Sequence, residues 1–265
     1  MTSTTPVHRD GLAIYRRLPP SGLPVVLVHG SMDRAAAFRK ATRHLRELDV
    51  TLYDRRGYGR SSADRSAGTM DELVDDLLTA SPDQPAVVVG HSLGAVIALA
   101  AAQQAPERVL GVGAFEAPMA WRPWWPAGSA GGVAREAALA EGPAAAAEHF
   151  MRRLLGEERW EALPDNTKAQ RRREGPALLA DLTAMRAGGP PFDAATLRVP
   201  VVVGCGTGTS DRHRRACHEL AAEAGDAELF EIADAPHGAH YTHPAAFAGF
   251  VRRTVERTHA RRPTP

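Results

Sequence analysis

Cysteine is scarce in this chain of 265 residues: it has only Cys205 and Cys217, which is too few for a disulfide framework. Both cysteines fall in predicted regular elements, so we expect packing roles for them. Charge of one sign is also lacking, because 32 Lys and Arg residues oppose 31 Asp and Glu residues. The formal net charge of +1 predicts no bulk attraction to nucleic acid or to an anionic membrane.

Long apolar runs are absent as well. No window approaches the roughly 18 apolar residues of a membrane helix. The stretch from Met1 to Asp10 is polar and lacks the apolar core of a secretory signal. We therefore expect a cytoplasmic protein without stable membrane association, of open oligomeric state. A composition of 44% hydrophobic and 24% charged residues is typical of a globular protein, and the length suits one large α/β domain with an insertion.

Short apolar runs alternate with helical patterns, which is typical of βαβ units and a largely parallel sheet. The expected strands are Val25–Val28, Val50–Tyr53, Ala86–Val89, Val109–Phe115, Val201–Gly204 and Glu228–Ile232. The expected helices are Ala35–Leu48, Met70–Leu78 with Thr69 as N-cap, Ala95–Gln104, Arg212–Ala224 and Ala245–Glu256.

The stretch from 118 to 199 interrupts this alternation. It contains all four tryptophans and several helical runs but no convincing strand. We expect a helical lid at 118–199, inserted into a core formed by 1–117 and 200–265. Such a lid would cover the carboxyl edge of the sheet, where open α/β sheets bind their ligands.

The segment Gly90-His91-Ser92-Leu93-Gly94 carries the strongest chemical signal. It has the pattern G-x-S-x-G between a strand and a helix, the arrangement of a nucleophile elbow. Small residues on either side of the serine permit a sharp turn that exposes Ser92 Oγ. Leu93 begins the next helix, so its free N–H can face a developing oxyanion.

Five segments together resemble the α/β-hydrolase superfamily in order and spacing. They are Leu27–Gly30, Tyr53–Ser62, the elbow, Ala105–Val109 and Ala235–His240. The resemblance implies a mostly parallel twisted sheet flanked by helices, with a helical cap after the sixth strand. It also implies a structural role for the arginine- and glycine-rich Arg55–Ser62 loop, which lacks P-loop spacing. The superfamily covers many chemistries, including esterases, lactonases and C–C bond hydrolases.

A serine needs a base within hydrogen-bond reach. His237 follows the last predicted strand and resembles the family's catalytic histidine, although Pro236 stands where glycine is usual. Its place after the nucleophile and the acid in chain order supports this role. His240 and His243 lie close in sequence, and we expect them to shape the loop or the cavity wall.

The acid that orients this histidine is harder to choose. The usual family location is the loop Cys205–Ser210, which has no carboxylate. Asp211 follows it but begins a predicted helix, where an acid often complements the dipole. Glu116 ends the preceding strand, and one branch of haloalkane dehalogenases, which this segment resembles, keeps its acid there. A buried carboxylate at this edge would be costly without a partner. Glu116 is the preferred acid and Asp211 the alternative.

The oxyanion hole needs a second donor besides Leu93. The resemblance places it after His29-Gly30, at Ser31 or Met32. Ser31 could equally cap a helix that starts near Asp33 or Arg34.

The expected substrate contacts are aromatic. The cluster Trp121, Trp124 and Trp125 could line an apolar acyl pocket or could anchor the lid, and His91 beside the nucleophile is expected to contact substrate.

These residues predict two-step acyl transfer through Ser92, His237 and Glu116 on a small to medium hydrophobic ester, thioester or lactone. A serine nucleophile argues against dehalogenase and epoxide hydrolase chemistry, in which the family uses aspartate. No metal or organic cofactor is implied, since no ligand cluster has suitable spacing. The alternatives are a C–C bond hydrolase, a non-hydrolytic biosynthetic enzyme on the same triad, or a catalytically idle ligand-binding member.

Overall fold

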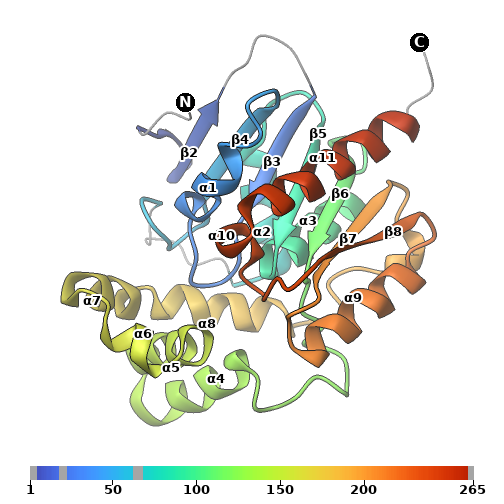
Figure 1. Ribbon diagram of the computed structural model, residues 1–265. Helices are drawn as coiled ribbons and strands as arrows, with labels where there is room; N and C mark the ends of the chain where they lie inside the picture. Colours follow the sequence, from blue (N-terminus) through green and yellow to red (C-terminus); the bar gives the residue numbers. More distant parts are fainter. Residues whose placement is uncertain (1–4, 18–22, 62–67, 262–265) are drawn as a thin grey trace.

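A mixed eight-stranded sheet with helices on both faces forms the body of the protein (Figure 1). The computed structural model describes residues 5–17, 23–61 and 68–261. The strand order is β1-β2-β4-β3-β5-β6-β7-β8, and all pairings from β4 through β8 are parallel. This confirms the predicted, mostly parallel sheet. The strands are β1 (Val7–Arg9), β2 (Leu12–Arg17), β3 (Pro24–Val28), β4 (Asp49–Asp54), β5 (Ala86–His91), β6 (Val109–Phe115), β7 (Val201–Gly206) and β8 (Ala227–Ile232).

Alternate residues of the central strands belong to two hydrophobic layers. Val25 and Leu27 of β3 pack under α11, whereas Val26 and Val28 pack against α2 and α3. Because both faces of these strands are covered, their sequences are continuous apolar runs rather than alternating ones. The core helices are α1 (Arg39–Thr42), α2 (Met70–Ala80), α3 (Leu93–Gln104), α9 (Asp211–Glu223), α10 (Ala239–Thr242) and α11 (Pro244–Arg261), with 3-10 turns at Ala35–Phe38 and Ala194–Thr196.

The predicted helix Ala35–Leu48 is wrong in extent. A 3-10 turn and the short helix α1 end at Thr42, and the chain then continues in tighter turns. The N–H groups of Arg43, His44 and Leu45 bond three residues back rather than four. Leu45 is still fully buried, so the apolar spacing that suggested a helix is satisfied by turns.

An antiparallel hairpin at the start of the described chain was not predicted. Strands β1 and β2 pair with register Arg9 to Leu12, joined by Asp10 and Gly11, which both have positive φ values of 47° and 80°. Positive φ at both central residues is the signature of a type I′ turn, for which Asp-Gly is a favoured pair. The signal was present in the sequence.

The helices α4 to α8 form the insertion after β6, as predicted, and lie together at one edge of the sheet (Figure 1). Their bounds are Ala130–Glu141 (α4), Pro143–Leu155 (α5), Glu157–Glu161 (α6), Asp165–Arg173 (α7) and Gly175–Ala184 (α8). Within the described residues, no helix is both long and apolar enough to cross a membrane.

A buried ion pair joins this insertion to the core. Arg55, directly after β4, donates two hydrogen bonds to the Asp181 carboxylate of α8, at 2.8 and 2.7 Å. The Tyr58 hydroxyl donates a third at 2.8 Å, and both charged side chains are at most 3% exposed. Planar bidentate pairing of this kind fixes geometry as well as charge. The Arg55–Ser62 segment therefore holds the insertion in place, although Ser62 itself lies outside the described residues.

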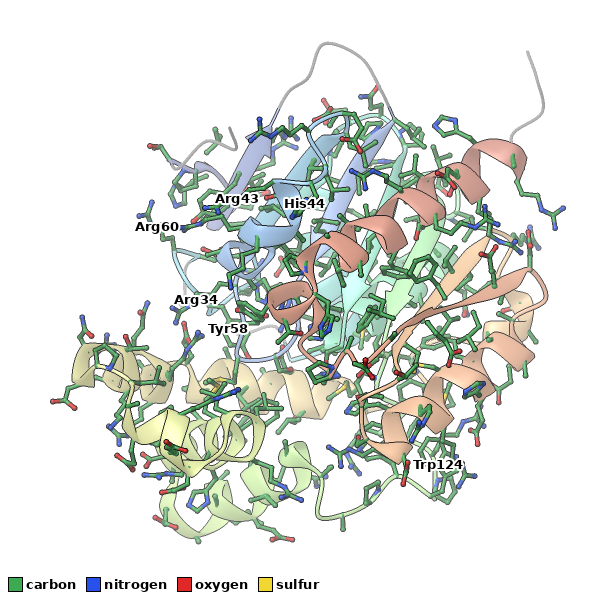
Figure 2. The ribbon with its side chains drawn as sticks, viewed as in Figure 1. Arg34, Arg43, His44, Tyr58, Arg60 and Trp124 are labelled. Carbon is green, nitrogen blue, oxygen red and sulfur yellow. The ribbon has the colours of Figure 1, made fainter. Side chains whose placement is uncertain are left out.

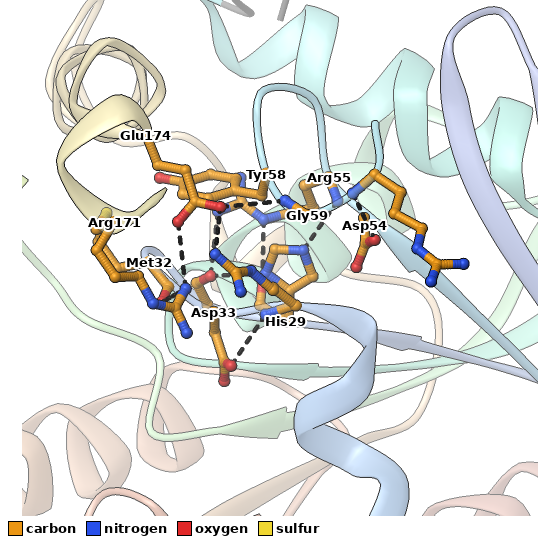
Figure 3. A network of polar contacts seen from close by, with 12 residues as sticks. His29, Met32, Asp33, Asp54, Arg55, Tyr58, Gly59, Arg171 and Glu174 are labelled. Atoms are coloured by element: carbon orange, nitrogen blue, oxygen red, sulfur yellow. Dashed lines mark hydrogen bonds and ion pairs between the residues drawn. The ribbon is translucent and has the colours of Figure 1, made fainter. Parts of the chain in front are cut away.

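A second polar cluster lies beside the first. Glu174 at the start of α8 accepts hydrogen bonds from Arg34 at 2.6 Å and from the Gly59 N–H at 3.2 Å. Arg171 of α7 bonds Glu174 at 3.2 Å and the Met32 carbonyl at 2.9 Å. Figure 3 shows these side chains converging next to His29. The loop after β3 is thus tied to both ends of the α7–α8 turn.

Candidate active site

The chain makes a tight turn at Ser92, and this turn requires glycine at positions 90 and 94. Ser92 stands between β5 and α3 with φ 55° and ψ −125°, a strained conformation for a residue with a side chain. A Cβ on Gly90 would lie 2.1 Å from the Gly94 carbonyl oxygen, and a Cβ on Gly94 would lie 2.1 Å from the Val28 carbonyl oxygen. Strand, turn and helix are therefore packed too closely for any larger residue. The turn presents Ser92 at the carboxyl edge of the sheet.

Several residues with strained backbone conformations lie at the carboxyl edge of the sheet. Among the described residues, five other than glycine have positive φ, and they include Met32 at 58°, Ser92 at 55° and Glu116 at 48°. Such conformations persist where the surrounding packing enforces them, which is common at functional sites. Each of the three follows a parallel strand at its carboxyl end.

Leu93 and Ser31 line one cavity together with Ser92. Leu93 is the first residue of α3, so its N–H precedes the first intrahelical acceptor and is free to bind a ligand. Met32, the other predicted donor, is not among the described residues that line this cavity. Its side chain is 3% exposed, and its carbonyl is bonded to Arg171. Of the two predicted second donors, only Ser31 is among the described residues that line the cavity.

His29 and Arg55 hold the loop that carries Ser31. The Arg55 N–H donates to His29 Nε2 at 2.8 Å, so the ring proton is on Nδ1 and is donated to the Gly30 carbonyl at 2.8 Å. Burial and the positive charge of Arg55 lower the pKa of His29 to about 4. The ring is therefore neutral near pH 7 and supports this bonding pattern (Figure 3).

Glu116 and His237 meet across 121 residues of sequence. His237 lies between β8 and α10, and its Nδ1 is 2.6 Å from Glu116 Oε2. Glu116 follows β6 directly and is fully buried. Its carboxylate also accepts from the Gly206 N–H at 2.9 Å and from the Thr209 hydroxyl at 2.8 Å. Three donors thus satisfy a carboxylate that would otherwise be costly to bury.

Asp211, the alternative acid, lies away from this contact. It is the first residue of α9, its side chain is 97% exposed, and it pairs with Arg214 at 2.8 Å. The loop before it contributes donors to Glu116 instead of a carboxylate, through Gly206 and Thr209. Of the two candidate acids, the structure brings only Glu116 to His237.

Ser92 and His237 line the same cavity, of ≈ 70 Å³. Among the described residues, the structure records the hydrogen bond from His237 to Glu116 but none from Ser92 to His237. The remaining wall is mainly apolar and comes from the insertion, with Phe150, Leu182 and Met185. A small, mainly apolar space beside a serine and an imidazole suits a short apolar group.

Further histidines surround His237. The His213 ring stacks on it, with centroids 4.3 Å apart and planes at 26°, and His213 also lines the cavity. His91 Nε2 donates to the His237 carbonyl at 2.8 Å. Burial lowers the pKa of both His91 and His213 well below 6.5, so both are neutral near pH 7. His91 was predicted to contact substrate, but it is not among the described residues that line the cavity. Its hydrogen bond holds the loop that carries His237.

His240 and His243, the other histidines near the predicted base, are not among the described residues that line the cavity. His240 is buried and bonds Asp33 at 3.1 Å, and Tyr241 donates to the same carboxylate at 2.7 Å. His243 pairs with the neighbouring Thr242 hydroxyl at 2.9 Å.

Two groups of side chains in the described chain are close enough to share a metal ion: Glu116, His213 and His237, and Asp33, His91 and His240. In each group the carboxylate already bonds a histidine. Sequence spacing indicated neither cluster, since the members of each come from elements far apart in the chain.

The three tryptophans have different surroundings. Trp125 lines the cavity and meets the His213 ring edge-on at 5.3 Å. Trp121 contacts Phe192 at 5.5 Å and lines a separate groove. Trp124 donates to Glu219 at 3.0 Å, and Figure 2 shows it at the outer side of the molecule near α9. Only Trp125 is placed to contact a ligand beside Ser92, and the other two anchor the segment before α4.

Sequence reasoning missed several residues at this site, including four with polar or charged side chains. His213, Arg186 and Arg212 line the cavity, and Thr209 bonds the acid. Thr209 had a usable signal, because a hydroxyl replaces the expected carboxylate in the loop after β7. The other three depend on how α8 and α9 face the sheet edge, which the sequence pattern does not specify.

Comparison with known proteins identifies the family of the chain. The profile of the Alpha/beta hydrolase family matches residues 25–250, and the chain belongs to that family. This is the family that the motifs predicted, and the curated relatives that the chain matches include a hydrolase and a lipase.

The sequence matches to individual proteins cover less than half of the chain, whereas the structural match covers nearly all of it. The chain is 33% identical to the hydrolase YugF of Bacillus subtilis over 117 residues, which are 40% of this chain and 43% of YugF. It is 32% identical to the lipase LipV of Mycobacterium tuberculosis over 101 residues, 36% of this chain and 37% of LipV. The chain thus spans about two fifths of the length of these curated relatives. A thermophilic esterase from Thermogutta terrifontis shares the fold with a TM-score of 0.72 at 24% identity, covering 98% of both chains.

Proposed function

We propose that the protein is a serine hydrolase that acts through a Ser92-His237-Glu116 triad on a small to medium hydrophobic ester, thioester or lactone. The observation that carries this proposal is the 2.6 Å contact between Glu116 Oε2 and His237 Nδ1 beside the cavity that Ser92 lines. A buried carboxylate in this position fixes the imidazole in the tautomer whose Nε2 can accept a proton.

The proposed reaction has two steps. His237 Nε2 takes the Ser92 hydroxyl proton while Oγ attacks the carbonyl, and Glu116 stabilises the resulting imidazolium. The Leu93 N–H and Ser31 stabilise the oxyanion, and the protonated His237 then passes its proton to the leaving group. Water, activated by the same histidine, releases the acid from the acyl-enzyme. Hydrogen bonds from serine to histidine are often long in unliganded enzymes and shorten when substrate binds.

The cavity supports the choice of substrate size. Its volume of ≈ 70 Å³ is well below the roughly 300 Å³ of sites that enclose drug-sized ligands. Its apolar wall belongs to α5 and α8 and to the segment after α8. We propose that residues 118–199 act as a lid over the core of 1–117 and 200–265.

A catalytically idle binding protein is the weaker candidate. Its sequence support was the loop after β7 that lacks a carboxylate. Gly206 and Thr209 of that loop both donate to Glu116, so the loop contributes to the same triad from the other side. This observation favours catalysis over binding alone.

Hydrolysis of 4-nitrophenyl butyrate tests the proposal. Replacing the nucleophile by Ser92→Ala should reduce kcat by at least about 10³-fold, since triad members act as one unit. Ser129→Ala is the matched control, because Ser129 lines the same cavity but caps α4. It should retain activity within about tenfold, the range of a lost cap or minor repacking. Hydrolysis that survives Ser92→Ala would contradict the proposal.

A further inference from the structure

The cavity beside Ser92 is lined by positively charged side chains but by no negatively charged one among the described residues. Arg186, two residues beyond the end of α8, and Arg212, in the first turn of α9, both line it. No Asp or Glu is among the described residues that line it. A mainly apolar wall that carries two guanidinium groups and no carboxylate is not what a purely hydrophobic ester requires.

Neither arginine forms an ion pair with a carboxylate among the described residues, although the charge of Glu116 attracts Arg212. This differs from Arg55 and Arg34, which each pair with a carboxylate at 2.7 and 2.6 Å. The Nε atom of Arg212 is buried and has no hydrogen-bond partner in the described structure. A buried donor without an acceptor costs free energy unless a ligand or water supplies one.

Neighbouring positive charges add to this imbalance. Arg153 repels Arg212, and Arg135 repels Arg186. Partial burial, followed by this repulsion, lowers the pKa of both arginines below its usual value, although Arg186 is exposed and Arg212 is half-buried. An anion bound in this cavity would offset these repulsions and could accept a hydrogen bond from the unpaired Arg212 Nε.

We propose that the substrate is an anionic ester whose carboxylate is bound by Arg212 and Arg186 while Ser92 attacks the ester carbonyl. Guanidinium groups suit a carboxylate because their donors match both of its oxygens. The apolar wall would contact the short chain between the two functional groups. This inference rests on the proposed ester hydrolysis and narrows its substrate class to esters with a second, negatively charged end.

Two matched pairs of esters test it and show which side of the ester carries the charge. Ethyl hydrogen succinate and ethyl butyrate differ by a carboxylate on the acyl side. Acetoxyacetate and ethyl acetate differ by a carboxylate on the alcohol side. Wild-type protein should have a higher kcat/KM for the anionic member of at least one pair, measured by acid release. A preference for the neutral member of both pairs would overturn the proposal.

Single substitutions then assign the preference to residues. Arg212→Gln and Arg186→Gln should each lower the anionic-to-neutral ratio of kcat/KM by about 10- to 100-fold, the effect of losing a charge-assisted hydrogen bond. Arg212→Lys should keep part of the preference, because it keeps the charge. Arg214→Gln is the control, since Arg214 is on the same helix but pairs with the exposed Asp211. If Arg214→Gln lowers the ratio as much as Arg212→Gln, long-range charge explains the preference and a specific site is refuted.

A binding measurement separates this inference from the hydrolytic proposal. Ligand-observed NMR with the Ser92→Ala protein should show tighter binding of the preferred anionic ester than of its neutral partner. Arg212→Gln in the same background should remove that difference. Selective binding of the anionic ester by a wild-type protein that hydrolyses neither would refute hydrolysis and uphold the anion site. Equal binding of both esters would refute the anion site.

Discussion

Replacing Glu116 by glutamine tests the triad most specifically, because the structure dictates how the amide must be oriented. The Gly206 N–H donates to the Oε1 position at 2.9 Å, so the glutamine oxygen must occupy that position. The amide NH₂ then faces His237 Nδ1, where the carboxylate Oε2 otherwise accepts a hydrogen bond at 2.6 Å. His237 can meet this donor only with an unprotonated Nδ1, which places the ring proton on Nε2. In that tautomer it cannot accept the proton of Ser92.

The expected loss is therefore that of a wrong tautomer, on the order of 10²–10⁴ in kcat. KM should change little, because Glu116 is fully buried and does not line the cavity in the described structure. The assay is steady-state hydrolysis of 4-nitrophenyl butyrate, with circular dichroism and a thermal midpoint to show that the variant is folded.

Asp211→Asn is the matched control, since it neutralises the other candidate acid at a side chain that is 97% exposed. It should leave kcat within about twofold, as expected for a surface change. A full loss in Asp211→Asn together with normal activity in Glu116→Gln would refute the assignment of the acid.

Three further predictions concern stability. Asp181→Ala leaves the buried Arg55 without its counter-ion and should lower the free energy of urea unfolding by about 3–5 kcal/mol; a loss below about 1 kcal/mol would contradict a tightly coupled pair. Gly94→Ala places a methyl group 2.1 Å from the Val28 carbonyl oxygen and should destabilise the fold by about 3 kcal/mol or more, which wild-type stability would contradict. The pKa of His29 falls from 6.5 unfolded to about 4 folded, so its stabilising contribution is present above pH 6.5 and is lost as pH falls toward 4. Between pH 7 and 5 this costs about 2 kcal/mol at 1.36 kcal/mol per pH unit, and equal urea stability at both pH values would refute it.

The sequence predicted the parallel part of the fold because its signals are local. Runs such as Ala86–Val89 and Val201–Gly204 are apolar on both faces, which marks strands that helices cover on both sides. The helix expected at Ala35–Leu48 was wrong, because the spacing of buried residues alone does not distinguish an α-helix from successive turns. The hairpin at Asp10 and Gly11 was missed although the turn pair was visible.

The site was predictable where one motif fixes local geometry. The G-x-S-x-G pattern indicates a tight turn at Ser92 from five consecutive residues, and Glu116 was preferred because a carboxylate ending a buried strand needs a partner. Residues that reach the cavity from separate elements were not predictable. Arg186 and Arg212 owe their position to the packing of α8 and α9, and His213 to a ring contact with His237, none of which leaves a pattern in sequence.

Covalent labelling of Ser92 tests the central claim most directly. Incubation with a small alkyl fluorophosphonate, followed by peptide mass spectrometry, should find the phosphonate on Ser92. The rate of labelling should fall by about 10²-fold or more in Glu116→Gln, since the reagent requires the activated hydroxyl. Labelling of another residue, or equally fast labelling of Ser92 in both proteins, would contradict a nucleophile activated by His237 and Glu116.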